Sequence, residues 1–130
     1  MSLDENKIKQ TLFDKGLEAF NNHCFYDAHE YWEDLWSDYK IKDPKFVQAL
    51  IQLSVGYFHI TNLNINGARG LLNKCLPKFN IYKPVCRGID VDNIIDSIHQ
   101  SLNNLDHIEN IADFNWSLVP KLDINDRRTV

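Results

Sequence analysis

The chain of 130 residues has the length of one domain, and with 44% hydrophobic and 12% aromatic residues it can form a hydrophobic core. This composition excludes intrinsic disorder and low-complexity structure. The net charge of −4 argues against a protein that binds nucleic acid over its whole surface.

Helical periodicity dominates the sequence, and no segment shows a convincing strand pattern. A first helix is expected over about residues 4–21 and a second over about residues 26–40. A third, over about residues 44–63, begins at Asp43-Pro44, since proline suits the first turn of a helix. This third helix is apolar on nearly every side, so we expect it to be the central element that the other helices surround.

Two further helices are expected in the second half of the chain. Asn64 or Asn66 begins the fourth, and Pro77 is expected to end it, which leaves residues 79–88 as a loop. Asp90 or Asp92 begins the fifth, which continues to about residue 108. The prediction is an all-α fold: one compact bundle of about five helices in a single domain over residues 1–130.

A C-terminal extension over about residues 111–130 follows the bundle. We expect its aromatic residues to pack on the bundle and the polar residues 126–128 to fray.

Several features favour a soluble, cytoplasmic protein. Three cysteines without paired spacing, Cys24, Cys75 and Cys86, indicate free thiols in a reducing compartment. The uncharged residues 46–68 contain too many polar groups for a membrane helix, and the N-terminus lacks the pattern of a signal peptide. The excess of aromatic residues is consistent with an exposed apolar patch and therefore with a homodimer.

The residues from Phe25 to Trp36 are the richest in chemical groups. On a helix, apolar residues that include Trp36 form a core-facing arc, with His29 at its edge and Glu33 one turn later beside it. A histidine and a glutamate with this spacing can form an ion pair, ligate a metal together, or act as a base and its orienting group. A structural polar pair that fixes two helices is the simplest of these interpretations.

The third helix carries a narrow polar stripe, formed by Gln48, Gln52, His59 and Asn62. Buried polar groups need partners, and the nearest expected ones are His29 and Glu33 on the preceding helix. We therefore predict an internal cluster of His29, Glu33, Gln52 and His59. As a metal site, His29, Glu33 and His59 would hold a divalent metal and leave one position for water.

Charge is unevenly distributed along the chain. Between Pro44 and Ile89 there is no Asp or Glu, and the segment from Arg69 to Arg87 contains five cations. This basic segment is a candidate for contact with an anion or with RNA. The alternative is that these cations pair with the acidic second helix.

Three segments resemble the domain of unknown function 309 family. Residues 25–36 (FYDAHEYWEDLW) are similar to its signature of an aromatic residue followed by x-x-A-H-E-x-x-E-x-L-W. Residues 49–59 resemble its L-I-Q-L helix, which ends near a histidine, and residues 66–72 and 88–90 resemble its G-A-x-x-L-L and G-hydrophobic-D elements. The similarity covers about residues 10–105 and leaves out the C-terminal extension.

The resemblance implies a small all-helical protein of no established activity. It also implies six signature positions: His29, Glu30, Glu33, Trp36, Gln52 and His59.

Two functions of different classes are consistent with these features. The first is a helical module that binds a protein partner or a small molecule through the groove beside His29 and Glu33, where tyrosine and tryptophan side chains gather. The second is a metal-assisted or acid–base hydrolase that uses His29, Glu33 and His59. Contact of the basic segment 69–87 with RNA is a more distant alternative.

Overall fold

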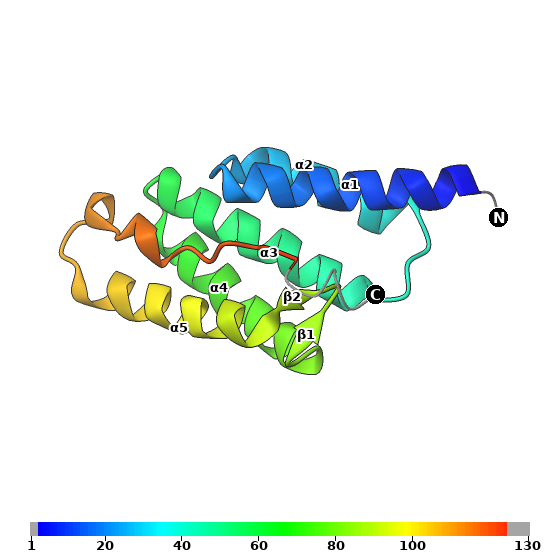
Figure 1. The fold of residues 1–130 in the computed structure, drawn as a ribbon. Helices are drawn as coiled ribbons and strands as arrows, with labels where there is room; N and C mark the ends of the chain where they lie inside the picture. Colours follow the sequence, from blue (N-terminus) through cyan, green and yellow to red (C-terminus); the bar gives the residue numbers. More distant parts are fainter. Residues whose placement is uncertain (1–2, 125–130) are drawn as a thin grey trace.

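The computed structural model describes residues 3–124, and five α-helices make up most of this part of the chain (Figure 1). The helices are α1 (Leu3–Asn21), α2 (Phe25–Asp38), α3 (Pro44–Thr61), α4 (Ile65–Ile81) and α5 (Val91–His107). A hairpin of β1 (Val85–Cys86) and β2 (Ile89–Asp90) joins α4 to α5, and two 3-10 turns, Ile111–Asp113 and Trp116–Leu118, follow α5. The predicted all-α bundle is confirmed.

Helix α3 is the central helix, as its largely apolar sequence predicts. It packs against α2 on one side and α4 on the other, so that α1 and α2 form one layer and α4 and α5 lie beyond α3 (Figure 1). Its fully buried side chains include Phe46, Leu50, Leu53 and Tyr57. The Tyr57 hydroxyl shares a buried hydrogen bond of 2.8 Å with the Ser101 hydroxyl, which ties α3 to α5.

Pro77 does not end the fourth helix, and the prediction that it would is wrong. Helix α4 continues through Pro77 to Ile81. The carbonyl that Pro77 leaves without a helical partner belongs to Asn73, which is exposed, so water can hydrogen-bond to it. Phe79 is fully buried, with its ring 5.9 Å from that of Phe46, and this packing keeps the last turn of the helix on the core.

Residues 79–88 are also not a plain loop, because they contain the start of a β-hairpin. Its two-residue turn is Arg87-Gly88, with φ of 52° and 74°. Such turns need positive φ at both positions, which glycine adopts freely and arginine only with strain. Strands of two residues leave no alternating pattern in the sequence, which explains why they were not predicted.

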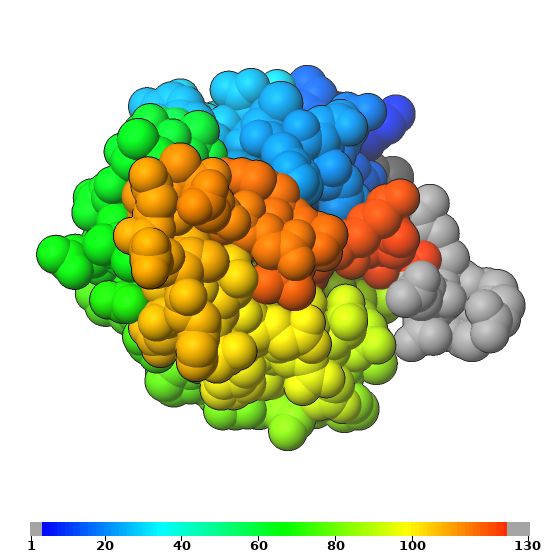
Figure 2. Space-filling model, turned by 90° about the vertical axis from the view of Figure 1, so that its left-hand side faces the viewer, coloured from blue at the N-terminus to red at the C-terminus, as the bar shows by residue number. Residues whose placement is uncertain are grey.

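The C-terminal extension packs on the bundle as expected. It lies across the face between the first two helices and α5 (Figure 2). The Trp116 ring stacks on Phe25 at 6.0 Å, and the Asn21 side chain makes two hydrogen bonds, of 2.8 and 3.1 Å, with the backbone of Leu122. The expected fraying of residues 126–128 concerns a segment outside the described residues.

Two expectations about the class of protein can be compared with the structure. All three cysteines are free thiols, as expected, with Cys24 exposed, Cys75 buried and Cys86 half-buried. Of the helices within residues 3–124, none combines the length and the hydrophobicity needed to cross a bilayer.

Candidate functional site

Helix α2 is fixed to the core by Trp32. This side chain is completely buried, and its indole N–H donates a 3.2 Å hydrogen bond to the backbone carbonyl of Phe13 on α1. The indole lies directly against the backbone of Gly16, where any side chain would overlap it. These contacts of Trp32 fix the rotation of α2 about its own axis, and the rotation determines which residues the helix exposes.

The edge of α2 next to its buried side, toward α3, carries a stripe of four residues, which we call the α2 face: Tyr26, His29, Glu33 and Trp36. Their spacing of three, four and three places them on one side of the helix. Tyr26 is 50% exposed and Trp36 38% exposed. The prediction that Trp36 lies on the buried arc is therefore wrong: Trp32 and Leu35 fill the core contact, and the Trp36 indole stays at the rim.

His29 and Glu33 form a pair on this face, as predicted. The Nε2 atom of His29 lies 3.8 Å from Oε2 of Glu33, and the side chains are 24% and 43% exposed. The Tyr26 ring lies between His29 and α3, with its centre 5.5 Å from the His29 ring and 5.4 Å from the Phe58 ring. The pair is thus held at the boundary between α2 and α3.

The other ring nitrogen of His29, Nδ1, is buried and has no hydrogen-bond partner among the described residues. This nitrogen is an acceptor when the ring proton is on Nε2 and a donor when it carries the proton itself. A buried polar atom without a hydrogen-bond partner destabilises a protein by about 1–3 kcal/mol.

Gln52 on α3 carries a second buried polar atom without a partner. It lies two turns before His59 on the same side of α3, and at His59 that side contacts α4. Gln52 is half-buried, and its Oε1 atom is buried without a hydrogen-bond partner among the described residues. His29 Nδ1 and Gln52 Oε1 are therefore two buried polar atoms without a partner among the described residues, and such atoms in a native structure call for an explanation.

His59, the fourth member of the predicted cluster, contacts α4 instead of the His29–Glu33 pair. Its Nδ1 atom lies 3.3 Å from the side-chain nitrogen of Asn64, and its ring packs against Gly67 in the first turn of α4.

The metal-ligand set of His29, Glu33 and His59 therefore has only its first two members in contact. Within residues 3–124, no group of three or more His, Cys, Asp or Glu side chains is arranged to hold a metal ion. Binding of a divalent metal stays a prediction.

The charge of α2 is strongly negative. The helix contains five carboxylates and no lysine or arginine, and Glu30, another signature position, is exposed on it next to the α2 face. The five carboxylates are Asp27, Glu30, Glu33, Asp34 and Asp38. Exposed carboxylates on one helix create a negative potential that attracts cationic groups.

The cations of the basic segment 69–87 do not neutralise this helix, and the expectation that they would is wrong. Arg69 pairs with Asp106 on α5 at 2.6 Å, and Lys83 pairs with Asp92 on the same helix at 3.7 Å. Arg87 pairs with Asp43. Three of the five cations are thus used inside the second half of the fold or at the start of α3.

The fold and the site define a class: an all-α bundle with an acidic, aromatic helix face beside its central helix. Residues 13–71 of the chain match the family model described as Domain of unknown function (DUF309), which confirms the resemblance found in the sequence. The matched segment contains all six signature positions and ends before the hairpin, so it is shorter than the similarity expected over about residues 10–105. None of the curated proteins matches the chain.

Proposed function

We propose that the protein is a binding module whose α2 face takes up a positively charged segment of a partner protein, one that carries arginine or lysine. The observation that carries this proposal is the position of the Glu33 carboxylate, which lies beside His29 and between two exposed aromatic rings on a helix that has no basic residue. A carboxylate accepts hydrogen bonds, and arginine and lysine side chains are donors only.

The charge of the surrounding helix supports the same class of ligand. Five carboxylates without a basic residue on α2 attract cations over several ångströms and speed their association. Glu33, next to His29, can accept a charge-assisted hydrogen bond from a ligand cation, and such bonds are stronger than those between neutral groups.

The two exposed aromatic rings complete the site. Tyr26 and Trp36 lie at opposite ends of the α2 face, with the His29–Glu33 pair between them. The face of an aromatic ring attracts a guanidinium or ammonium group, by about 0.5–1 kcal/mol at an exposed position. Tyrosine and tryptophan are also enriched in protein interfaces, where they bury large areas at low entropic cost.

Binding of a short arginine peptide, measured by isothermal titration calorimetry at low and physiological salt, tests the proposal. Glu33→Gln should weaken binding roughly tenfold, as expected for the loss of a charge-assisted hydrogen bond. Asp34→Asn is the matched control: it removes the same charge from an exposed residue outside the α2 face and should have a much smaller effect. Absence of binding at low salt, or equal losses in both variants, would refute the proposal.

Gln52→Leu separates a binding role of the acceptor from a structural one. Removing an unpaired buried oxygen should raise the free energy of unfolding by about 1 kcal/mol. Because Gln52 lies outside the α2 face and its oxygen is buried, the same variant should leave peptide binding unchanged. A stabilised variant that binds the peptide as tightly as the parent would show that Gln52 takes no part in binding.

A further inference from the structure

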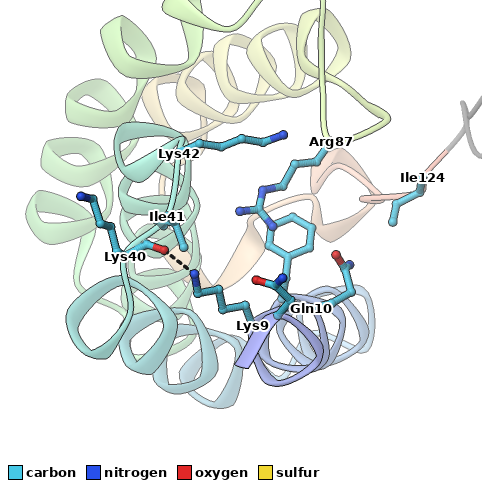
Figure 3. A pocket seen from close by; sticks show the side chains of 9 residues that line it. Lys9, Gln10, Lys40, Ile41, Lys42, Arg87 and Ile124 are labelled. Carbon is cyan, nitrogen blue, oxygen red and sulfur yellow. Dashed lines mark hydrogen bonds between the residues drawn. The ribbon is translucent and has the colours of Figure 1, made fainter. Parts of the chain in front are cut away.

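We propose that a second site, a cavity between α1, the connection from α2 to α3 and the hairpin, binds the phosphate group of a small phosphorylated molecule. The cavity has a volume of about 660 Å³ and shares no residue with the α2 face. Cavities of roughly 300–1,000 Å³ are typical of small-molecule sites. Its walls come from α1, residues 40–42, Arg87 and Ile124 (Figure 3).

The lining of this cavity is basic. It includes Lys9, Lys40, Lys42 and Arg87, and none of the described residues that line it is acidic. The charged ends of Lys9, Lys42 and Arg87 lie around the opening, whereas the Lys40 side chain points away from it (Figure 3). In a chain with a net charge of −4, three converging cations mark a local preference for anions.

Arg87 is held rigidly in this position. Its guanidinium donates two hydrogen bonds to the carboxylate of Asp43, from Nε at 2.7 Å and from Nη2 at 2.8 Å, and it lies 4.3 Å from the centre of the Phe13 ring. Asp43 occupies the N-cap position of α3, but its side chain makes no capping hydrogen bond there. The carboxylate instead fixes the orientation of Arg87.

The fixed guanidinium still has donors to offer. Asp43 accepts from Nε and Nη2, which leaves both N–H bonds of Nη1 and one of Nη2 available to a ligand. The backbone of Arg87 has a positive φ of 52°, a conformation with a steric cost for any residue except glycine. The turn itself would favour glycine at this position, so the presence of an arginine is explained by the interactions of its side chain.

Lys9 and Lys42 add two ammonium groups to the free N–H groups of the Arg87 guanidinium, which we call the guanidinium fork. Lys9 is held by a 2.6 Å hydrogen bond to the backbone carbonyl of Lys40 and lies 3.6 Å from Glu5. The ammonium of Lys42 has no hydrogen bond or ion pair within residues 3–124. The cavity thus combines two cations held in place with a third that makes no such contact to the described residues.

Phosphate is the anion that suits this arrangement best. Its three terminal oxygens can accept from the guanidinium fork and from both ammonium groups at once, and a dianion gains more than a carboxylate from three cations. The cavity is much larger than the phosphate group alone, and Phe13, Ile41 and Ile124 give it apolar walls. An aromatic or aliphatic phosphate monoester therefore fits better than inorganic phosphate.

Titration calorimetry at low salt with phenyl phosphate, inorganic phosphate and benzoate tests this inference. We expect phenyl phosphate to bind at least tenfold more tightly than either comparison compound. Inorganic phosphate lacks the apolar ring, and benzoate lacks the phosphate group. Lys42→Met should weaken phenyl phosphate binding about tenfold. Failure of phenyl phosphate to bind, or benzoate binding as tightly, would overturn the assignment.

Lys40→Met is the matched control, because it removes the same charge two residues away and keeps the backbone carbonyl that holds Lys9. Binding of phenyl phosphate should change less than twofold. Equal losses in Lys40→Met and Lys42→Met would show that only the overall charge matters and would overturn the proposed site. Neither variant should weaken binding of the arginine peptide, so the two proposals can fail independently.

Discussion

Gly16 offers the sharpest test of how α1 and α2 pack. It lies on α1 with its Cα hydrogens against the indole of Trp32, which is completely buried. An alanine Cβ at this position would overlap the indole nitrogen and the carbons bonded to it. Gly16→Ala should therefore force the indole to move and break its 3.2 Å hydrogen bond to the Phe13 carbonyl.

The size of the effect follows from three contributions. Overpacking a core usually destabilises by about 1–3 kcal/mol, and leaving the indole N–H buried without an acceptor adds about 1–3 kcal/mol. The higher helix propensity of alanine offsets about 1 kcal/mol of this. Gly16→Ala should thus lower the free energy of unfolding by roughly 1–5 kcal/mol.

Urea denaturation followed by circular dichroism measures this change, and Gly70→Ala provides the control. Gly70 lies on the exposed side of α4, and a Cβ there would meet no atom within 4 Å. Its replacement should stabilise the protein by about 0.5–1 kcal/mol through helix propensity alone. If Gly16→Ala were as stable as the parent, or if both variants were stabilised, the packing described here would be refuted.

Three further predictions concern groups away from Gly16. Burial alone would raise the pKa of Asp43, but the hydrogen bonds and charge of Arg87 outweigh it and lower that pKa below its ordinary value. The stability that Asp43 contributes is therefore present above its unfolded pKa of about 3.9 and is lost as the pH falls through the folded value. In urea titrations at decreasing pH, the free energy of unfolding should fall less steeply for Asp43→Asn than for the parent. Burial raises the pKa of the Cys75 thiol to about 12, so at about pH 8 a thiol reagent should modify exposed Cys24 quickly and Cys75 only after unfolding; equal rates in the native protein would contradict this. Asn64→Ala removes the acceptor of a 3.0 Å capping hydrogen bond at the start of α4 and should destabilise by about 1 kcal/mol in thermal denaturation, whereas an unchanged midpoint would show that the cap is dispensable.

The helices could be predicted because their signals are local. The ends of α1 to α3 lie within about two residues of those expected, since apolar periodicity and the proline at the start of α3 depend only on neighbouring residues. The continuation of α4 through Pro77 could not be predicted in this way. It depends on the packing of Phe79 against Phe46, and these residues are far apart in the sequence.

The candidate site could be predicted only where its contacts are local in the sequence. The pairing of His29 with Glu33 follows from their separation on one helix, but the contacts of His59 depend on how α4 crosses α3. The cavity that we propose binds phosphate could be predicted only in part, because the basic segment 69–87 contains Arg87 but not the other two cations. Its cations come from α1, from residue 42 and from the hairpin turn, and only the tertiary fold brings Lys9, Lys42 and Arg87 together.

The two proposed sites differ in how they relate to the family match. The α2 face and Gln52 lie wholly within residues 13–71, whereas the cavity also needs Lys9, Arg87 and Ile124, which lie outside that segment. A protein that shares the matched helices but has a different second half would therefore keep the acidic face and lose the guanidinium fork. Such a protein should bind the arginine peptide and not phenyl phosphate. If it bound both, the phosphate would have to be held by groups other than Arg87, and the role proposed for the Arg87 guanidinium would be refuted.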